Sequence, residues 1–394
     1  MPTNERRSLL YIALGSMDSP NMLGVQRKIS GQLHAFQRVI GEGHVAVMEQ
    51  CTDKGILQSN ALEQCWPLKK GVNHYRSSMS KCISTNIEQC AFDFIYLRFP
   101  GPFDFTTLRI LRHFRASKIA LEVPTYPLTG EWRLTIIQLL RKHQLARLLL
   151  FLAHLMLHVL LRRIAMHYVD FLYVIGDAPK SLWGVKVHPL VNGYIIENEP
   201  LPPIKKKTGF LHLVCVSAME PWHGIDRIIS GIADYNSKQN HWIVNLHLVG
   251  EGKSESLLRE QVVQLGLENQ VIFHGPLSGQ RLRQIYEDSD IGISSLGLHR
   301  NGVLSASVLK SREYCSLGLP FVLAYDDPAF PVEFPYCLHV DATDRPINVE
   351  DIVQFYLRLP PEARSECRSY AELTLPWDRT LHDFIDFMKS GNHD

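Results

Sequence analysis

The sequence predicts an α/β fold made of two Rossmann-like domains in tandem that face a central cleft. Strand patterns alternate with amphipathic helix patterns through both halves of the 394 residues, which implies parallel strands joined by crossover helices. Residues 198–207 separate the two series with three prolines and a lysine run, and they lack apolar periodicity, as a linker does. In open α/β sheets ligands bind at the carboxyl ends of the strands, so two facing domains would place a cleft between them.

The first series opens with a buried-strand run at residues 9–14 and a helix pattern at residues 25–40, whose apolar side chains recur on one face. A second helix is predicted around residues 106–116. The remaining strand patterns of this half lie at residues 44–48, 92–98, 118–123, 168–175 and 186–191. We therefore expect an N-terminal domain at residues 1–199, on the acceptor side of the cleft.

The second series follows the linker, which we place at residues 200–207. Its strand patterns lie at residues 210–216, 244–249, 271–273, 291–293 and 321–324, and its helix patterns at residues 225–235, 254–265, 279–288 and 307–317. We expect this domain to span residues 208–374. Residues 375–394 hold a final amphipathic helix.

Composition excludes several classes of function. The 41 basic and 40 acidic residues nearly balance, so the chain lacks the overall positive charge of a nucleic-acid-binding protein. Its eight cysteines are scattered without a Cys-x-x-Cys pair or a Cys/His cluster, which argues against a zinc site. The short charged N-terminus does not resemble a signal peptide, and we expect reduced thiols and a cytoplasmic protein.

The helix pattern of residues 307–317 carries the strongest functional signal. Ser305 or Ser307 suits its N-cap, and Gly318 suits the left-handed residue that ends a helix. Such a helix N-terminus favours an anion, because its free N–H groups and its dipole both attract negative charge.

Three charged residues follow within this helix. Lys310 and Arg312 would add positive charge for a phosphate, and Glu313 would accept two hydrogen bonds from a ribose diol. The alternative is a capped amphipathic helix with ordinary surface charges.

Glycine-containing turns follow successive strands of the second domain. The loop after the first strand holds Ser217, Trp222, His223 and Gly224, where an anion could meet backbone N–H groups. Later turns hold Gly250, Gly252 and Gly275. Each turn alone is a weak signal, but together with the Lys310 helix they predict a nucleotide pocket at one edge of the sheet.

The order of these motifs resembles that of GT-B glycosyltransferases, in particular glycosyltransferase family 4 and its capsule and exopolysaccharide subgroup. In the second half the resemblance rests on Val249-Gly-Glu-Gly252, Val271-Ile-Phe-His-Gly275, Tyr286-Glu-Asp-Ser-Asp-Ile-Gly-Ile-Ser294, and Glu313 with Gly318-Leu-Pro320. In the first half, residues 24–28 are similar to the family's N-terminal glycine-rich loop, and residues 122–131 resemble a segment of the subgroup.

The resemblance implies a nucleotide-diphosphate sugar as donor, a UDP- or GDP-sugar, with no permanently bound cofactor and no metal. It implies roles for Glu313 and Lys310 in catalysis. Glu122 follows a strand that would face the cleft, so it could offer a catalytic carboxylate to a sugar acceptor; the alternative is a loop shaped around core residues. Gly24 and Arg27 could approach the donor phosphate from across the cleft, with solvated surface charge as the alternative. The resemblance further implies a retaining transfer to a saccharide or lipid-linked acceptor in surface polysaccharide synthesis. The C-terminal helix would cross back onto the first domain, and domain closure would expel water from the donor site.

Two positions depart from the family pattern. Ser305 occupies the place of the first of two glutamates, and Ala218 and His223 lie where the family places Arg and Lys on the diphosphate. Arg227, Lys310 and Arg312 are the possible substitutes. A divergent transferase explains these changes; a sugar-nucleotide 2-epimerase or a non-catalytic nucleotide-sugar-binding subunit are the alternatives.

Residues 145–161 are strongly apolar and are flanked by Arg141-Lys142 and Arg162-Arg163. At seventeen residues the segment is short for a membrane span, and Arg147, His154 and His158 make it polar for one. An interfacial helix with basic ends fits better and predicts peripheral contact through residues 145–163, on the inner face of the cell membrane. The alternative is a buried core helix.

Overall fold

The computed structural model describes residues 7–16, 23–50, 54–59, 62–67, 92–99, 101–196, 202, 209–238 and 241–390. It divides into two compact units, the first made of Met1–Val191 with Thr380–Asp394 and the second of Asn192–Arg379. The structure therefore assigns residues 192–196 to the second unit, earlier than the expected boundary at residue 199. Apart from Pro202, the expected linker lies outside the described residues.

The first unit is built on a nine-stranded sheet of order β4-β3-β2-β1-β5-β6-β7-β9-β8. Strands β2, β1, β5, β6, β7 and β9 are parallel, whereas β3, β4 and β8 pair antiparallel with their neighbours. The strands are β1 (Leu9–Ser16), β2 (Val45–Gln50), β3 (Lys54–Ser59), β4 (Leu62–Pro67), β5 (Phe94–Arg98), β6 (Lys118–Tyr126), β7 (Phe171–Gly176), β8 (Ser181–Leu182) and β9 (Val185–Pro189). The parallel part confirms the predicted alternation, but the sequence patterns did not predict β3, β4 or β8.

Helices cover this sheet and close its core. They are α1 (Leu23–Ile40), α3 (Phe105–His113), α4 (Thr129–Arg141), α5 (Leu145–Ala165) and α13 (His382–Ser390), with short 3-10 turns η2 (Glu42–His44) and η3 (Met166–Tyr168). The ring of Phe384 in α13 packs edge-on against Phe36 of α1 and Phe94 of β5, with centroids 5.8 and 6.1 Å away. The last helix of the chain is therefore part of the first unit.

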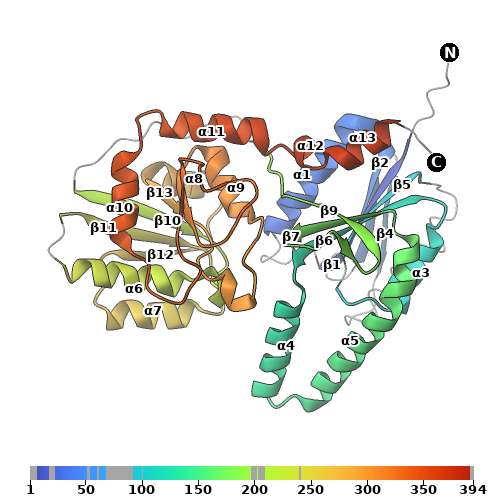
Figure 1. Cartoon of the computed structure of the whole chain (residues 1–394), viewed down its shortest axis with the longest axis horizontal. Helices are drawn as coiled ribbons and strands as arrows, with labels where there is room; N and C mark the ends of the chain where they lie inside the picture. The colour runs from blue at the N-terminus through green and yellow to red at the C-terminus, as the bar shows by residue number, and fades with distance from the viewer. Residues whose placement is uncertain are drawn as a thin grey trace. The chain divides into compact units, whose positions relative to one another are not determined.

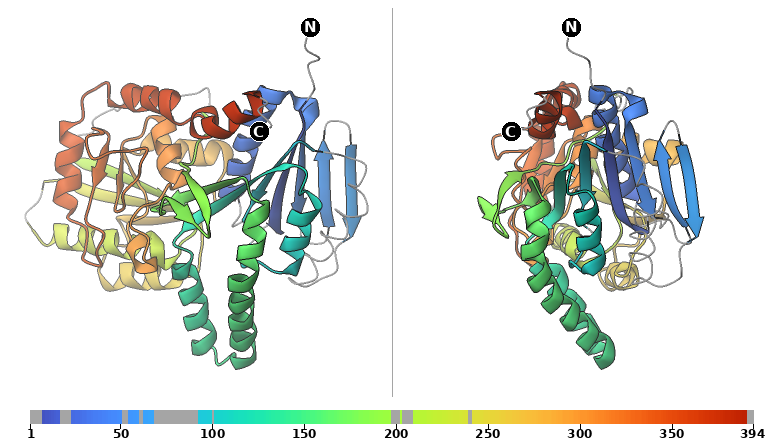
Figure 2. Two further views of the ribbon diagram at one scale, coloured as in Figure 1. Left: turned by 45° about the vertical axis from the view of Figure 1, so that its right-hand side comes forward. Right: turned by 90° about the vertical axis from the view of Figure 1, so that its right-hand side faces the viewer.

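Helices α4 and α5 form a long antiparallel hairpin that projects from the sheet (Figures 1 and 2). Only the C-terminal half of α5 contributes to the core, through His158, Leu161 and Ala165. Helix α5 is thus not the buried core helix that was the alternative for residues 145–161.

The second unit is built on a six-stranded, wholly parallel sheet of order β12-β11-β10-β13-β14-β15. This is the strand order of a Rossmann fold, in which the chain reverses direction across the sheet between its first and fourth strands, here β10 and β13. The strands are β10 (Phe210–Val216), β11 (Ile243–Val249), β12 (Val271–Gly275), β13 (Ile291–Ile293), β14 (Phe321–Leu323) and β15 (Cys337–His339).

The helices of the second unit lie on both faces of its sheet (Figure 1). They are α6 (Ile225–Asn236), α7 (Glu255–Gln264), α8 (Gly279–Asp288), α9 (Leu309–Leu317), α10 (Val349–Arg358), α11 (Ala363–Thr374) and α12 (Trp377–Thr380), with 3-10 turns η4 (Pro221–His223) and η5 (Leu298–Asn301). Helices α6 to α9 agree with the sequence patterns to within two residues at each end. The predicted final helix is divided into α12 and α13 at Leu381.

Helix α9 begins later than predicted. Its N-cap is Val308, without a side-chain hydrogen bond, so neither Ser305 nor Ser307 caps the helix as expected. The Ser307 hydroxyl instead accepts a hydrogen bond from the backbone N–H of Asn192 at 2.6 Å. Gly318 ends the helix at φ +78, as predicted, and a Cβ there would lie 2.4 Å from the Arg364 carbonyl oxygen.

Candidate functional site

The candidate site lies at the carboxyl edge of the second sheet, where the loops after β10 and β13 meet. The N–H of Leu296 donates to the His223 carbonyl oxygen at 2.9 Å and joins the two loops. Gly224 caps α6 at φ +66, and a Cβ there would lie 2.6 Å from the Leu296 carbonyl carbon. Only glycine satisfies both the left-handed conformation and this close approach. The site is therefore at the switch point of the sheet, where open α/β folds bind ligands.

The turn after β11 packs against the same loop. Gly250 adopts φ +119, and a Cβ there would lie 2.2 Å from the Ser217 carbonyl oxygen. A Cβ at Gly252 would lie 2.4 Å from the Met219 nitrogen. The N–H of Gly250 donates to the Gly275 carbonyl oxygen at 2.8 Å. The structure thus brings together the predicted residues Ser217, Gly250, Gly252 and Gly275.

Lys310 supplies a buried cation at this edge. Its side chain is only 9% exposed, and within the described ranges its Nζ has no hydrogen-bond partner. Burial lowers the pKa of Lys310, while the nearby Cys215 acts in the opposite direction. A buried ammonium without a counter-charge is costly and therefore uncommon, and an anion at this position would offset that cost.

His223 lies beside Lys310. Burial lowers the pKa of His223 well below its ordinary value, and the Lys310 charge lowers it further. The imidazole is therefore neutral at neutral pH, and its ring forms a hydrogen bond with the backbone of Ala218. Trp222 precedes His223, with the two ring planes inclined at 62° and their centroids 6.2 Å apart.

Glu313 lies one helical turn after Lys310 and is partly buried. Burial raises the pKa of the Tyr286 phenol well above its ordinary value, and the neighbouring Glu313 carboxylate raises it further. Tyr194 also lies close to Tyr286. Glu313 is therefore a carboxylate beside buried aromatic side chains, an environment in which it can hold a neutral hydroxyl ligand through charge-assisted hydrogen bonds.

Two of the expected phosphate-binding arginines are structural. Arg312 is fully buried and forms a bidentate ion pair with Asp327. This pair occupies the guanidinium N–H groups that a phosphate would need. Arg227 is also buried and donates to the carbonyl oxygens of Leu296, Asp341 and Arg345. The expectation that these residues bind a diphosphate is corrected, because their donors are already occupied. Lys310 is left as the available cation of the three.

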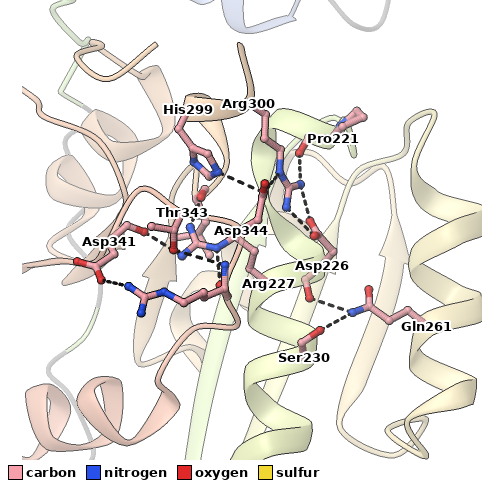
Figure 3. Close-up of polar contacts among 12 residues, drawn as sticks. Pro221, Asp226, Arg227, Ser230, Gln261, His299, Arg300, Asp341, Thr343 and Asp344 are labelled. Carbon is pink, nitrogen blue, oxygen red and sulfur yellow. Dashed lines mark hydrogen bonds and ion pairs between the residues drawn. The ribbon is translucent and has the colours of Figure 1, made fainter. Parts of the chain in front are cut away.

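A polar network holds the loop before α6 in place (Figure 3). Arg300 donates to both Asp226 carboxylate oxygens at 2.8 and 2.7 Å and to the Pro221 carbonyl oxygen at 2.7 Å. Its Nε donates to Asp344 at 2.7 Å. This network fixes η4, and with it His223, against η5. Sequence reasoning missed it, because Arg300 lies 74 residues from Asp226 and has no local pattern that marks it.

The predicted residues of the first unit are placed differently. Gly24 and Arg27 lie exposed in the first two turns of α1. Glu122 lies within β6 and is fully buried, with its carboxylate 2.7 Å from the Lys28 ammonium and accepting from Gln32 and Tyr96 at 2.7 Å each.

Burial raises the pKa of Glu122, but Lys28 and Arg98 outweigh this effect and the net pKa is lowered. The carboxylate is thus ionised and fully engaged. This corrects the expectation that Glu122 presents a free carboxylate to an acceptor.

Comparisons with known proteins find similarity in the second unit and in the fold as a whole. A family model described as glycosyl transferases group 1 matches residues 198–326, about a third of the chain, which include the loops after β10, β11 and β13. A search of curated proteins finds no match.

Solved structures resemble nearly the whole chain. Sucrose-phosphate synthase from Thermosynechococcus elongatus has a TM-score of 0.65 at 11% identity, with 98% of this chain and 99% of that chain covered. HepE from Anabaena in complex with UDP has a TM-score of 0.61 at 13% identity over 97% and 100% of the chains. The pneumococcal O-GlcNAc transferase GtfA in complex with UDP and GlcNAc has a TM-score of 0.58 at 11% identity over 99% and 100%.

At these identities the resemblance establishes the fold. The chain has the GT-B fold, with two Rossmann-like domains each built on a largely parallel sheet. The matched family model and this fold together support an enzyme of the glycosyltransferase class.

Proposed function

We propose that this protein is a glycosyltransferase that transfers a sugar from a nucleotide-diphosphate donor, a UDP- or GDP-sugar. One observation carries the proposal: the buried ammonium of Lys310 lacks a partner within the described ranges and lies at the switch point of a Rossmann sheet. Together with the N-terminus of α9, this cation suits the diphosphate of the donor. Glu313, one turn further along α9, suits the ribose.

The chemistry follows from the charge that develops during transfer. When the bond between the sugar and the phosphate breaks, the electron pair leaves with the diphosphate and its negative charge increases. A fixed ammonium and backbone N–H groups stabilise that charge without reorganising. Neutral His223 lies beside Lys310 and adds no second full charge. We propose that this arrangement replaces the missing Arg and Lys of the family pattern.

The acceptor and setting are part of the same proposal. We propose a saccharide or lipid-linked acceptor in surface polysaccharide synthesis, transfer with retention of configuration, and a cytoplasmic enzyme that contacts the inner face of the membrane through residues 145–163. Support for the donor comes from the fold's relatives, since HepE and GtfA were solved with UDP. Support for membrane contact is the exposed apolar surface of α5.

A thermal-unfolding panel tests the donor site. We would measure the melting temperature with UDP, GDP, ADP and CMP and with the sugar conjugate of each, because a ligand at 100 times its dissociation constant adds about 2.7 kcal/mol of stability. Stabilisation by one diphosphate and its sugars is expected. A flat panel in a folded sample would contradict the donor site.

Product analysis then separates the alternatives. Incubating the stabilising sugar nucleotide with membrane lipid extracts should release the free nucleotide diphosphate and a glycosylated lipid or saccharide. An epimerised sugar nucleotide formed without any acceptor would indicate the 2-epimerase. Donor binding without turnover would indicate the non-catalytic binding subunit, with Ser305 in place of a glutamate as its cause.

A further inference from the structure

Helix α5 exposes a continuous apolar face. Eight large apolar side chains along it are between 39% and 67% exposed: Leu145, Leu149, Leu150, Leu152, Met156, Val159, Leu160 and Ile164. Within the described part of the chain, Leu145–Tyr168 is the helical segment apolar and long enough to cross a membrane by composition and length, and only 17% of its most apolar window is buried. A patch of this size on a soluble surface marks an interaction site.

Charge around this face has a single sign. Between Glu131 and Asp170 the sequence contains six Arg or Lys residues and no Asp or Glu. Arg141, Lys142 and Arg147 are exposed near the turn that joins α4 to α5, and Arg163 is exposed at the other end of α5. A basic rim around an apolar helix complements the anionic headgroups and acyl chains of a lipid bilayer. A protein partner would not require this uniform sign.

A pocket of about 630 Å³ opens at the C-terminal end of α5. Arg162, Arg163 and His167 line it together with Met166 and with Trp183 from the turn between β8 and β9. Guanidinium groups in such a pocket bind phosphate through paired hydrogen bonds. The pocket therefore joins a cationic wall to the end of the apolar face.

The turn that carries Trp183 is unusual. Trp183 and Gly184 have φ values of +56 and +90, as in a tight two-residue hairpin turn that favours Asn and Gly. A tryptophan in the left-handed region is uncommon and strained. Its ring packs against Phe99 and Phe103, with centroids 5.9 and 5.8 Å away. Tryptophan is enriched at membrane–water interfaces, where its amphipathic ring is favoured.

We propose that the α4–α5 hairpin binds an anionic membrane side-on, with the outward face of α5 among the acyl chains and the Arg162–Arg163–Trp183 pocket around the phosphate of an anionic lipid headgroup. This deepens the membrane contact proposed above by naming the inserted face and the headgroup site. Its tests measure binding alone, so they succeed or fail independently of glycosyl transfer.

Helix lengths favour side-on binding over spanning. The 21 residues of α5 extend about 31 Å, close to the hydrocarbon thickness, but the 13 residues of α4 extend only about 20 Å. A spanning hairpin needs two helices of full length, and its tip would carry Arg141, Lys142 and Arg147 through the hydrocarbon. Lying in the interface, both helices keep these side chains at the headgroups.

Vesicle co-sedimentation of the full chain tests the apolar face. The wild type should bind vesicles of phosphatidylcholine mixed with phosphatidylglycerol and bind phosphatidylcholine alone weakly. Leu149→Gln/Leu150→Gln/Leu160→Gln should weaken binding to the mixed vesicles about tenfold or more, because membrane affinity scales with buried apolar area. The matched control is a triple Gln variant of Leu257, Val263 and Leu373, which are 66%, 62% and 70% exposed in the second unit.

Several results would overturn the apolar face as a membrane surface. These are equal losses in the two triple variants, no binding by the wild type, or unfolding of the α5 variant by circular dichroism. Light scattering provides a further check. If the wild type is a dimer that does not bind vesicles, and the α5 variant is a monomer, the apolar face would be assigned to contact with a second copy of the chain instead.

A second variant tests the headgroup pocket. Arg162→Gln/Arg163→Gln should reduce binding to phosphatidylglycerol vesicles about fivefold or more per arginine and leave the weak binding to phosphatidylcholine unchanged. Arg281→Gln, an exposed arginine of α8, is the control and should bind like the wild type. Equal losses on both kinds of vesicle, or no loss on either, would overturn the headgroup site.

Discussion

Replacing Lys310 with Met should stabilise the ligand-free protein while weakening diphosphate binding. The substitution keeps an unbranched side chain that is one atom shorter, and it removes the charge. In the wild type the ammonium is buried, and its pKa is lowered by that burial. A buried polar group without a partner costs about 1–3 kcal/mol, and more when it is charged. We therefore expect Lys310→Met to raise the free energy of unfolding by about 1–3 kcal/mol in the absence of ligand.

The same substitution removes a charge-assisted contact to the diphosphate. Such contacts contribute about 1.5–3 kcal/mol, so the dissociation constant for UDP should rise by about 10- to 150-fold. Binding of uridine, which lacks phosphates, should change little. The same comparison applies to GDP and guanosine if the thermal panel selects a guanine nucleotide.

Urea denaturation measures the first effect, and isothermal titration with the diphosphate and its nucleoside measures the second. The stability gap between wild type and variant should narrow as pH rises toward 10.5, the ordinary pKa of lysine, because deprotonation of Lys310 removes the penalty. Lys238→Met, at an exposed position after α6, is the control and should change neither quantity. A less stable Lys310→Met protein, or equal losses for nucleotide and nucleoside, would refute the reasoning.

Three further predictions concern Glu313, the Arg312–Asp327 ion pair and a partly buried histidine of β11. Glu313→Ala should weaken UDP and uridine equally, by about 1.5–3 kcal/mol in titration, if the carboxylate holds the ribose; unchanged affinity would exclude that role. Asp327→Asn should lower the free energy of unfolding by about 3–5 kcal/mol, because it leaves the buried Arg312 charge unpaired; a loss below about 1 kcal/mol would contradict a buried ion pair. Burial and the imidazoles of His212 and His274 lower the pKa of His247 to about 4. Between pH 6.5 and 4 the unfolded state therefore binds a proton that the folded state does not, so the free energy of unfolding of the wild type should fall as pH drops through this range. His247→Gln should make the free energy of unfolding depend less on pH in this range. Identical pH profiles for the wild type and the variant in urea denaturation would refute the lowered pKa of His247.

Much of the fold could be read from periodicity. The central parallel strands and the helices between them have regular apolar patterns, and β10, α6 and α8 lie within one residue of their predicted bounds. Strands β3 and β4 were missed because they extend the sheet antiparallel beyond β2, outside the alternation of strands and helices that the sequence patterns follow. The stability of an edge pair depends on its neighbour in the sheet, which a local pattern does not contain.

The glycine turns show what a motif can and cannot predict. Spacing after successive strands placed Gly250 and Gly252 at the sheet edge, as the structure confirms. The reason for glycine at these positions is a contact with the loop of Ser217 and Met219, more than thirty residues earlier in the sequence. Only the packed loops reveal that a side chain at either position would collide with backbone.

The sequence by itself determined which charges helix α9 carries, and the tertiary structure decided what each one does. Lys310 and Arg312 are two residues apart, so they point to different sides of the helix. One side meets Asp327, which the chain brings back through β14, and that carboxylate neutralises Arg312. On the other side, the ammonium of Lys310 lies beside a neutral imidazole and meets no carboxylate within the described residues. Two similar cations thus separate into a structural residue and a candidate ligand-binding residue, because the available charge of each depends on neighbours that only folding supplies.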